Sequence, residues 1–259
     1  MNPAQMSVIR PTMSRILKGF ILSLLLVSIS MAQSHKPALQ HNMVLVVGGK
    51  FQMGDDHGYE MEQPAHPVTI KSFYIDKYEV SVKEYQRFCI ETHRAMPSEP
   101  AWGWHDNFPI SNVSWDDAVS YAAWVGKRFP TEAECEFAAR GGILSKGYKY
   151  SGGDNIDEVA WYDENSNNSV HSVGTKESNE LKLFDMTGNV LEWCADKYDG
   201  DYYRVSPKEN PPGPQIGSDR VLRGGSYIGD KDDCRIAKRF SRKPDVSLFS
   251  FGFRCAMDK

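Results

Sequence analysis

Three segments of the chain place apolar residues at helical spacing directly after a residue that can cap a helix. The motif Ser81–Glu84 is a capping box at the start of the first segment, and Ser114 precedes the second. The motif Thr131–Glu134 is another capping box, and its helix is expected to end at Gly141-Gly142. The pattern therefore predicts three helices in the first half of the chain.

Short extended runs flank these helices. They are expected at Met43–Val47, Val68–Tyr74, Val221–Tyr227 and Ser250–Ala256. From Ile143 to about Asp219 the chain is rich in Gly, Asn, Asp, Ser and Pro, and scattered aromatic residues indicate that this loop region is ordered. With no repeat and no linker, the pattern predicts one α+β domain with little regular secondary structure.

The N-terminus has the layout of a secretory signal. Arg10, Arg15 and Lys18 precede a short apolar run that ends at Ala32. We therefore predict a signal peptide over residues 1–32, a short tether over 33–42 and the folded domain over 43–258. A membrane anchor is the alternative, but the run is shorter than the ~20 apolar residues of a membrane span. Cleavage near Ala32 predicts a secreted or periplasmic protein without a membrane span.

The composition narrows the function further. The chain of 259 residues is 41% hydrophobic, which fits a folded protein, and its formal charge of −4 argues against nucleic acid as a partner. No zinc-binding pair of cysteines, HExxH motif, phosphate-binding glycine loop or GxSxG elbow occurs. The sequence therefore lacks the motifs that would support its assignment as a metalloprotease, kinase, dehydrogenase or serine hydrolase.

Two segments could carry chemistry. Asp185–Trp193 holds two carboxylates around a glycine turn, which suits a hard cation such as calcium, although acidic glycine turns are common without one. Cys234 follows the glycine-rich bend Gly224–Tyr227. Its thiol could be a nucleophile or a soft-metal ligand, or it could be a packed or disulfide-bonded cysteine.

Eight motifs, in this order, carry a resemblance to a known family: Gly48–Gly54, Val68–Ile70, Tyr78–Ser81, Asn112–Ala118, Arg128–Glu134, Gly188–Trp193, Arg223–Ser226 and Gly252–Arg254. The chain resembles the formylglycine-generating enzyme, or sulfatase-modifying factor, family from about Met43 to Met257. The resemblance implies that family's variant of the C-type-lectin fold, which is stabilised by calcium.

The resemblance also implies metal ligands. One calcium would be bound by the side chains of Asp185 and Glu192 and by the carbonyls of Gly188 and Val190. A second calcium would lie near Asn165 and Asn167, where the match is loose.

The family's enzymes oxidise a substrate cysteine to formylglycine with oxygen, and they use two cysteines that bind copper(I). The resemblance places the second of these on Cys234, the first on Gly229, and a residue beside the pair on Ser226. One thiolate cannot reproduce a two-sulfur copper site, so the usual oxidase activity is not expected.

Four functions remain open at this point. The first is a calcium-stabilised protein that binds a peptide, protein or small-molecule ligand in a surface cleft without the standard activity. The second is an active, oxygen-dependent sulfatase-maturing oxidoreductase, which would need a replacement copper ligand. The third is a different oxidation of a small molecule, and the fourth is a structural component of a cell-envelope or gliding-motility machine.

The five cysteines and several aromatic residues raise further questions. The family resemblance implies a bridge from Cys255 to the position of Ala139, so we hypothesise a shifted Cys135–Cys255 disulfide, with Cys89 and Cys194 in the core. Four aromatic residues could line a ligand groove or fill the core: Trp102, Trp104, Tyr202 and Tyr203.

Overall fold

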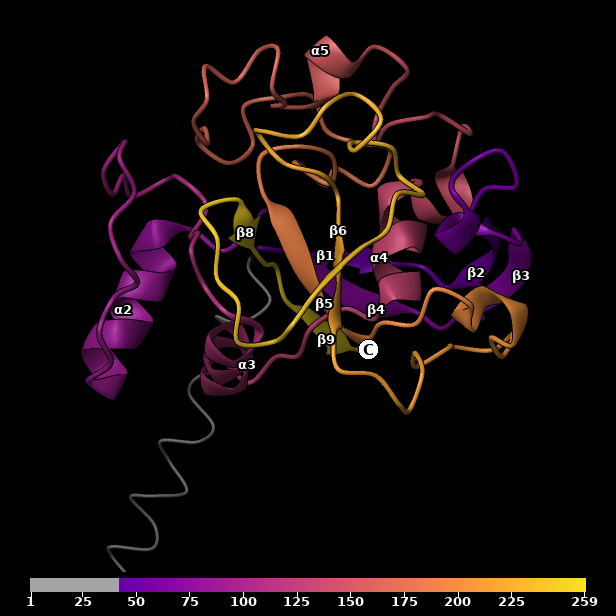
Figure 1. Ribbon diagram of the computed structural model, residues 1–259, viewed down its shortest axis with the longest axis horizontal. Coiled ribbons are helices and arrows are strands. Elements are labelled where there is room, and N and C mark those ends of the chain that lie inside the picture. The colour runs from indigo at the N-terminus through magenta and orange to yellow at the C-terminus, as the bar shows by residue number, and fades with distance from the viewer. Residues whose placement is uncertain (1–41) are drawn as a thin grey trace, which may run out of the picture. The chain divides into compact units, whose positions relative to one another are not determined.

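A computed structural model describes residues 42–259, and the three predicted helices are present in it (Figure 1). They are α2 (Val82–Thr92), α3 (Trp115–Trp124) and α4 (Glu132–Ala139). Ser81, Ser114 and Thr131 each accept a hydrogen bond from the backbone N–H three residues later, and all three capping boxes are complete. Local sequence therefore fixes where each helix begins.

The other helical segments are short and were not predicted. Three are single 3-10 turns, and α5 is one turn of α-helix whose start is capped by Asn155. Their bounds are Glu60–Glu62, Gly142–Leu144 and Tyr202–Arg204 for the 3-10 turns, and Ile156–Val159 for α5.

Two small sheets form around the first strands. In one, β4 (Phe73–Asp76) pairs with both β1 (Met43–Val46) and β9 (Ala256–Asp258), which joins the two ends of the described domain. In the other, β2 (Gly49–Met53) pairs with β3 (His66–Ile70). The single extended run expected over residues 68–74 is wrong, because the chain breaks between β3 and β4 and enters a different sheet.

A four-stranded sheet lies at the centre, in the order β7-β6-β5-β8. Its strands are β5 (Leu191–Lys197), β6 (Arg220–Arg223), β7 (Phe240–Arg242) and β8 (Phe251–Gly252). The sequence patterns did not predict β5, and β6 ends before Gly224, earlier than expected. In Figure 1, α2 and α3 lie on one side of this sheet and α4 lies on the other.

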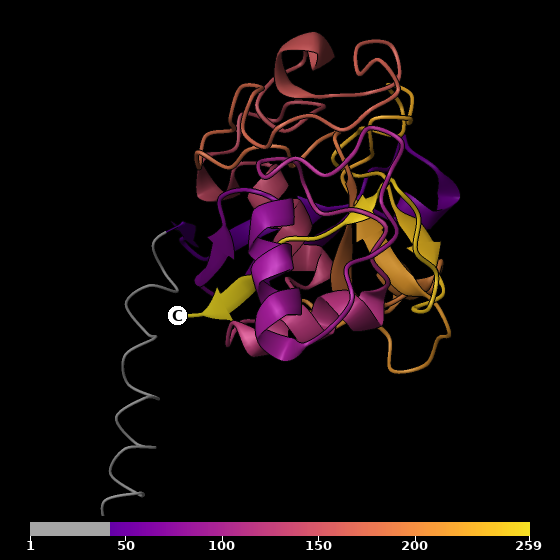
Figure 2. The same ribbon diagram turned by 90° about the vertical axis from the view of Figure 1, so that its left-hand side faces the viewer.

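Two large apolar clusters form the core. One packs α4 against β1 to β4 and includes Phe73 and Phe137, while the other packs α2 and α3 around Trp193 and Phe253. Figure 2 shows α2 and α3 from their outer side. The aromatic side chains of the loop region that are buried, such as Tyr162, confirm that this region is ordered.

Buried ion pairs join α4 to the strand β6 and the segment after it. Arg239 donates to both carboxylate oxygens of Glu132 at 2.7 and 2.9 Å, and Arg223 donates to Glu136. Glu136 also accepts from the N–H of Gly54 at 2.8 Å. None of the four charged side chains is more than 2% exposed. We call Glu132, Glu136, Arg223 and Arg239 the α4 ion-pair network.

Residues 42–259 include no helix long and apolar enough to cross a membrane. The predicted signal peptide and tether lie outside the described residues, except for Asn42.

Candidate functional site

The segment Ser226–Cys234, which we call the thiol turn, follows directly after β6. The chain leaves the strand through Gly224 and Gly225, whose φ angles are 98° and 78°. A Cβ atom on Gly225 would lie 2.8 Å from the sulfur of Cys234, so only glycine lets the backbone cross this thiol so closely. The turn packs against α5 at the upper edge of Figure 1.

The thiol of Cys234 is completely buried, among Tyr150, Tyr162 and residues of α5. Burial, and then the negative charge of Asp233, raise its pKa to about 12, although the backbone N–H of Ser226 partly opposes them. Because the thiolate is the form that attacks electrophiles and binds metals, a thiol protonated at neutral pH is poorly suited to either role.

Gly229 lies at the middle of the thiol turn. Its N–H donates to the carbonyl of Ser226 at 3.0 Å, and its own carbonyl accepts from the N–H of Asp163 at 3.1 Å. Asp230 follows, and its carboxylate accepts from two backbone N–H groups of the turn. The turn therefore combines one buried thiol with nearby carboxylates, and this donor set does not fit copper(I), which favours two thiolates.

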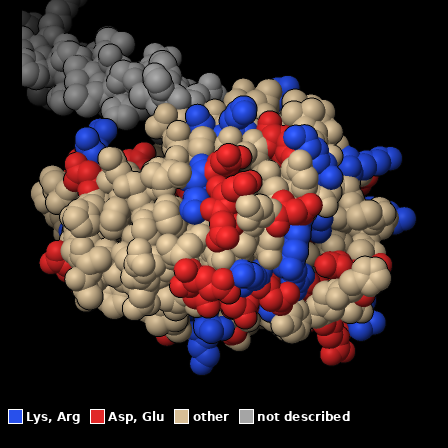
Figure 3. All heavy atoms as spheres, turned by 90° about the horizontal axis from the view of Figure 1, so that it is seen from above, with Lys and Arg blue, Asp and Glu red and all other residues tan. Residues whose placement is uncertain are grey.

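Apolar side chains surround part of the thiol turn at the surface. The ring of Trp102 lies 5.3 Å from that of Tyr227 and 6.0 Å from that of Phe249, edge-to-face in both cases. Phe249 is 38% exposed, and its neighbour Leu248 and Ile228 of the turn are more exposed still. We call Trp102, Tyr227, Ile228, Leu248 and Phe249 the aromatic wall. In the view of Figure 3, most charged side chains gather in the centre and right, and a tan area with charged side chains only at its edges lies to the left.

The acidic turn Asp185–Glu192 forms a second candidate site. Glu192 accepts two hydrogen bonds from Arg254, at 2.6 and 2.7 Å, and Asp185 accepts one from the N–H of Gly174 at 2.6 Å. Glu79, which sequence reasoning missed, accepts from the N–H of Val190 at 3.2 Å. Three buried carboxylates thus lie near one guanidinium.

The charge of this cluster changes the protonation of its acids. Burial raises the pKa of Asp185 to about 6, and Arg254 lowers it only in part. Burial, with the charges of Asp185 and Glu192, also raises the pKa of Glu79 well above its usual value. Surplus negative charge of this kind is relieved by protons or by a bound cation.

We tested whether calcium fits the acidic turn. Within the described part of the chain, the carbonyls of Gly188 and Val190 accept no backbone or side-chain hydrogen bond, and one oxygen of Asp185 is free as well. Residues 42–259 contain no group of three or more His, Cys, Asp or Glu side chains placed to hold a metal. The predicted calcium ligands include only two carboxylates. The free oxygens of Gly188, Val190 and Asp185 suit a hard cation. Both oxygens of Glu192, however, already accept hydrogen bonds from Arg254.

The residues predicted near a second calcium lie apart from this turn. The side chain of Asn165 accepts from the N–H of Tyr162 at 3.0 Å and donates to the carbonyl of Ala160 at 3.0 Å, so it stabilises its own loop. Asn167 is exposed, with a left-handed φ of 54°. A second calcium at these two residues stays a prediction.

The hypothesised Cys135–Cys255 disulfide is wrong. All five cysteines are free and buried, and Cys135 and Cys255 belong to different apolar clusters. Cys135 lies in the same apolar cluster as Cys194 instead. Cys135 lies one helical turn before Ala139 on α4, and its side chain packs in the cluster that holds Cys194 of β5. Cys89 and Cys194 are core residues, as predicted.

Tyr202 and Tyr203 are also core residues, whereas Trp102 and Trp104 are partly exposed.

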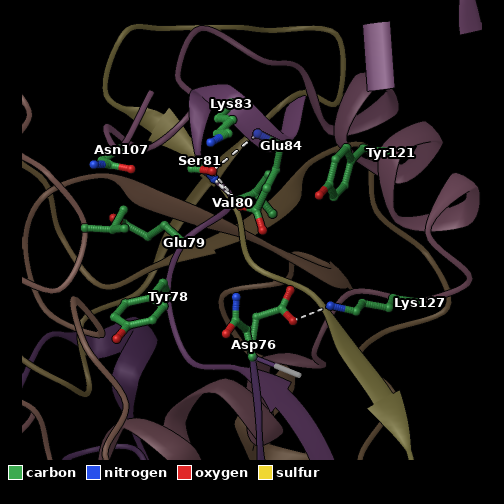
Figure 4. A pocket seen from close by; sticks show the side chains of 12 residues that line it. Asp76, Tyr78, Glu79, Val80, Ser81, Lys83, Glu84, Asn107, Tyr121 and Lys127 are labelled. Atoms are coloured by element: carbon green, nitrogen blue, oxygen red, sulfur yellow. Dashed lines mark hydrogen bonds and ion pairs between the residues drawn. The ribbon is translucent and has the colours of Figure 1, made fainter. Parts of the chain in front are cut away.

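A polar cavity of about 250 Å³ lies between the end of β4 and the start of α2 (Figure 4). Asp76 and Lys127 form an ion pair of 2.5 Å on one side, and Glu84 lies on the other. The hydroxyl of Tyr121 points toward the space between them. Sequence reasoning missed this cavity, because its lining comes from strands and helices far apart in the chain, and neither the thiol turn nor Asp185 lines it.

Comparison with known protein families matches residues 30–259 to the sulfatase-modifying factor enzyme 1-like domain. The chain therefore belongs to the formylglycine-generating enzyme, or sulfatase-modifying factor, family. It is 33% identical to the formylglycine-generating enzyme of Streptomyces coelicolor, over 86% of this chain and 91% of that protein. It is 31% identical to the inactive C-alpha-formylglycine-generating enzyme 2 of Bos taurus, over 83% of this chain and 87% of that protein.

A third relative is longer. The serine/threonine-protein kinase Pkn1 of Chlamydia trachomatis serovar L2 is 38% identical over 83% of this chain, which spans only 38% of that protein.

Solved structures agree with the fold. Treponema denticola variable protein 1 has a TM-score of 0.74 at 26% identity, and PvdO from Pseudomonas aeruginosa has a TM-score of 0.73 at 27% identity. Each alignment covers 84% of this chain, and 95% and 94% of the respective structures.

Proposed function

We propose that this protein is an exported, calcium-binding member of the family that binds a polypeptide segment at the aromatic wall and does not oxidise it by the two-thiol copper route. The observation that carries the proposal is the state of Cys234. Its thiol is buried, protonated at neutral pH, and accompanied in the turn by carboxylates and by Gly229 instead of a second thiol.

The surface beside the thiol turn supports the binding half of the proposal. Exposed aromatic and aliphatic side chains offer contact area, and edge-to-face aromatic groups are common anchors in protein interfaces. Asp163, Asp230 and Asp233 lie close enough to Cys234 for their charges to act on its thiol. A segment with apolar residues and a basic side chain would complement this surface.

The relatives are consistent with a family member that has lost the standard chemistry. One relative is named an inactive enzyme, and it aligns over most of both chains. At least one protein of this family is therefore named as inactive, and a fold alone does not determine the reaction.

Calcium is the second part of the proposal. When bound, calcium would offset the surplus charge of Glu79, Asp185 and Glu192 and would hold the acidic turn in shape. The residues that would hold it are Asp185 and Glu192, through their side chains, and Gly188 and Val190, through their carbonyls.

Export predicts that the mature chain lacks the residues up to Ala32. Intact mass of protein purified from its native cell checks this, and a chain that retains its first residues in the cytoplasm would contradict it.

A peptide of the pattern Cys-Xaa-Pro-Xaa-Arg tests the function directly. We expect saturable quenching of tryptophan fluorescence, no oxygen consumption and no change in peptide mass. Replacement of Trp102 by Ala should weaken binding about tenfold or more, whereas Tyr74→Ala, on the far sheet, should not. Conversion of the peptide cysteine to formylglycine, lost in Cys234→Ala, would overturn the non-oxidase half. Absence of any saturable binding would overturn the binding half.

A further inference from the structure

Two buried cysteines face each other between α4 and β5. Cys135 is 5% exposed and Cys194 is completely buried, and both belong to the same apolar cluster. The thiol of Cys135 lies close enough to that of Cys194 to help raise its pKa, after burial, and the thiol of Cys194 also lies 3.9 Å from the carbonyl oxygen of Glu192. The two sulfur atoms are therefore neighbours from residues 59 positions apart in the chain.

The elements that carry these cysteines are fixed against each other on both sides of the pair. The N–H of Ala195 donates to the carbonyl of Pro130 at 3.0 Å, just before α4. The N–H of Glu132 donates to the carboxylate of Asp196 at 2.8 Å. The indole of Trp115 donates to the carbonyl of Cys194 itself at 2.8 Å. Helix and strand thus hold the two thiols in one relative position.

The other three cysteines have different surroundings. Cys89 lies on α2, and its sulfur is 3.5 Å from the carbonyl oxygen of Ala95. Cys255 lies beside Asp76, which accepts from its N–H at 3.0 Å, and Cys234 lies in the cluster around α5. Among the five cysteines, all of which lie within the described residues, only Cys135 and Cys194 show a thiol–thiol contact.

We propose that Cys135 and Cys194 form an intramolecular disulfide when the chain folds in the presence of a disulfide oxidant, such as glutathione disulfide or an oxidised thiol–disulfide oxidoreductase. One thiolate attacks the oxidant and forms a mixed disulfide, with release of one reduced thiol. The second cysteine then displaces the other half of the oxidant. Two electrons and two protons pass to the oxidant, which leaves as two thiols, and one S–S bond joins the two cysteines.

The bond can form with a small movement. Both cysteines already lie in one apolar cluster, and the sulfur atoms need to close to about 2.05 Å. Because both thiols are buried in the folded protein, the oxidant reaches them before α4 packs on β5, and the folded, reduced protein reacts slowly.

The bridge would enclose the irregular part of the domain. The chain between Cys135 and Cys194 contains α5 and the whole acidic turn Asp185–Glu192. A covalent link across this segment limits the conformations of the unfolded chain, so it stabilises the fold in the region with the least regular structure.

The experiment compares wild-type protein refolded from the reduced, unfolded state with and without a glutathione redox buffer. Free thiols are then blocked with iodoacetamide in denaturant, and the peptides are mapped by mass. We expect a linked Cys135–Cys194 peptide pair that is lighter by two hydrogen atoms, and alkylated Cys89, Cys234 and Cys255. The melting temperature of the oxidised form should exceed that of the reduced form by about 5–10 °C.

Variants provide the controls. Cys135→Ala should lose the difference in melting temperature between the two refolding conditions, whereas Cys89→Ala should keep it. Full alkylation of Cys135 and Cys194 in oxidised wild-type protein, or a bridge from either one to another cysteine, would overturn the proposal. Because the wild-type chain gives the primary readout, a variant that fails to fold does not weaken the test.

Discussion

Arg223 of the α4 ion-pair network and the thiol turn lie on the two sides of Gly224 in the chain, yet the network and the turn are built very differently. In the network, every carboxylate faces a guanidinium, and Arg223 at the end of β6 is buried and paired. In the thiol turn, a few residues later, carboxylates gather around a protonated thiol. The buried charges of the α4 ion-pair network are therefore all paired, although the thiol turn lacks the second thiol of a two-thiol copper site.

The largest expected effect follows from breaking the network. Burial opposes ionisation of Glu136, but Arg140 and Arg223 outweigh it and lower its pKa. Glu136→Gln would leave Arg223 buried without its closest carboxylate, with Glu132 3.7 Å away, and should lower the free energy of unfolding by about 3–5 kcal/mol. Urea denaturation measures this. The matched control is Glu91→Gln, which removes an exposed pair with Arg87 and should cost under about 1 kcal/mol. Equal losses in both variants would contradict the central role of the network.

The pH dependence of stability distinguishes a paired carboxylate from an unpaired one. Asp196 lies beside the network, and burial, with the charge of Glu132, raises its pKa to about 8. Because this value lies above the 3.8 of the unfolded chain, Asp196 stabilises the fold most at low pH, and this contribution is lost progressively as the pH rises from about 4 to about 8.

We therefore expect the free energy of unfolding of wild-type protein to fall by roughly 3 kcal/mol more than that of Asp196→Asn between pH 5 and pH 8. Denaturation curves at the two pH values test this difference. Parallel pH profiles for the two proteins would show that Asp196 is ionised at neutral pH.

Calcium removal probes the acidic turn with a smaller effect. Addition of EGTA should lower the stability of wild-type protein by about 2 kcal/mol, or about 5 °C in melting temperature. The shift should be larger at pH 8 than at pH 5, because Asp185 with a pKa of about 6 must be deprotonated to bind the ion. Asp185→Asn should abolish the shift, and Asp245→Asn, on an exposed loop, should retain it. An unchanged melting temperature of the wild type would show that calcium does not stabilise the acidic turn.

The smallest effect on stability is expected from placing a thiol at position 229. A Cβ atom on Gly229 would lie 3.2 Å from the Cβ of Asp233 and 3.4 Å from the carbonyl oxygen of Ser226, so the neighbouring side chain needs to yield only slightly. Gly229→Cys should therefore change the free energy of unfolding by less than about 1 kcal/mol. Gly229→Ala is its matched control. A larger loss in both variants, measured by urea denaturation, would show that glycine is needed there for packing.

The sequence predicted the fold best where the determinants are local. A capping box spans four residues, so the starts of α2, α3 and α4 can be located without tertiary information. β5 was missed because it is buried on both sides and shows no alternation of polar and apolar residues. The break between β3 and β4 depends on which sheet each strand joins, and local composition does not specify that.

The candidate sites divide in the same way. The acidic turn is contiguous, and its residues could be named from the sequence. Its partner Arg254 lies 62 residues after Glu192, and Glu79 lies more than 100 residues before it, so their part in the cluster appears only in the fold. The Cys135–Cys194 contact was missed for the same reason, because helical spacing gives the face of α4 but not the strand that packs on it.

We propose that the thiol turn of this protein holds no two-thiol copper site. Titration of the mature wild-type protein and of Cys234→Ala with copper(I), in competition with a chromophoric chelator, tests it most directly. We expect that neither protein withdraws copper from the chelator and that the two curves coincide. A tight one-to-one complex of the wild type that disappears in Cys234→Ala would contradict it.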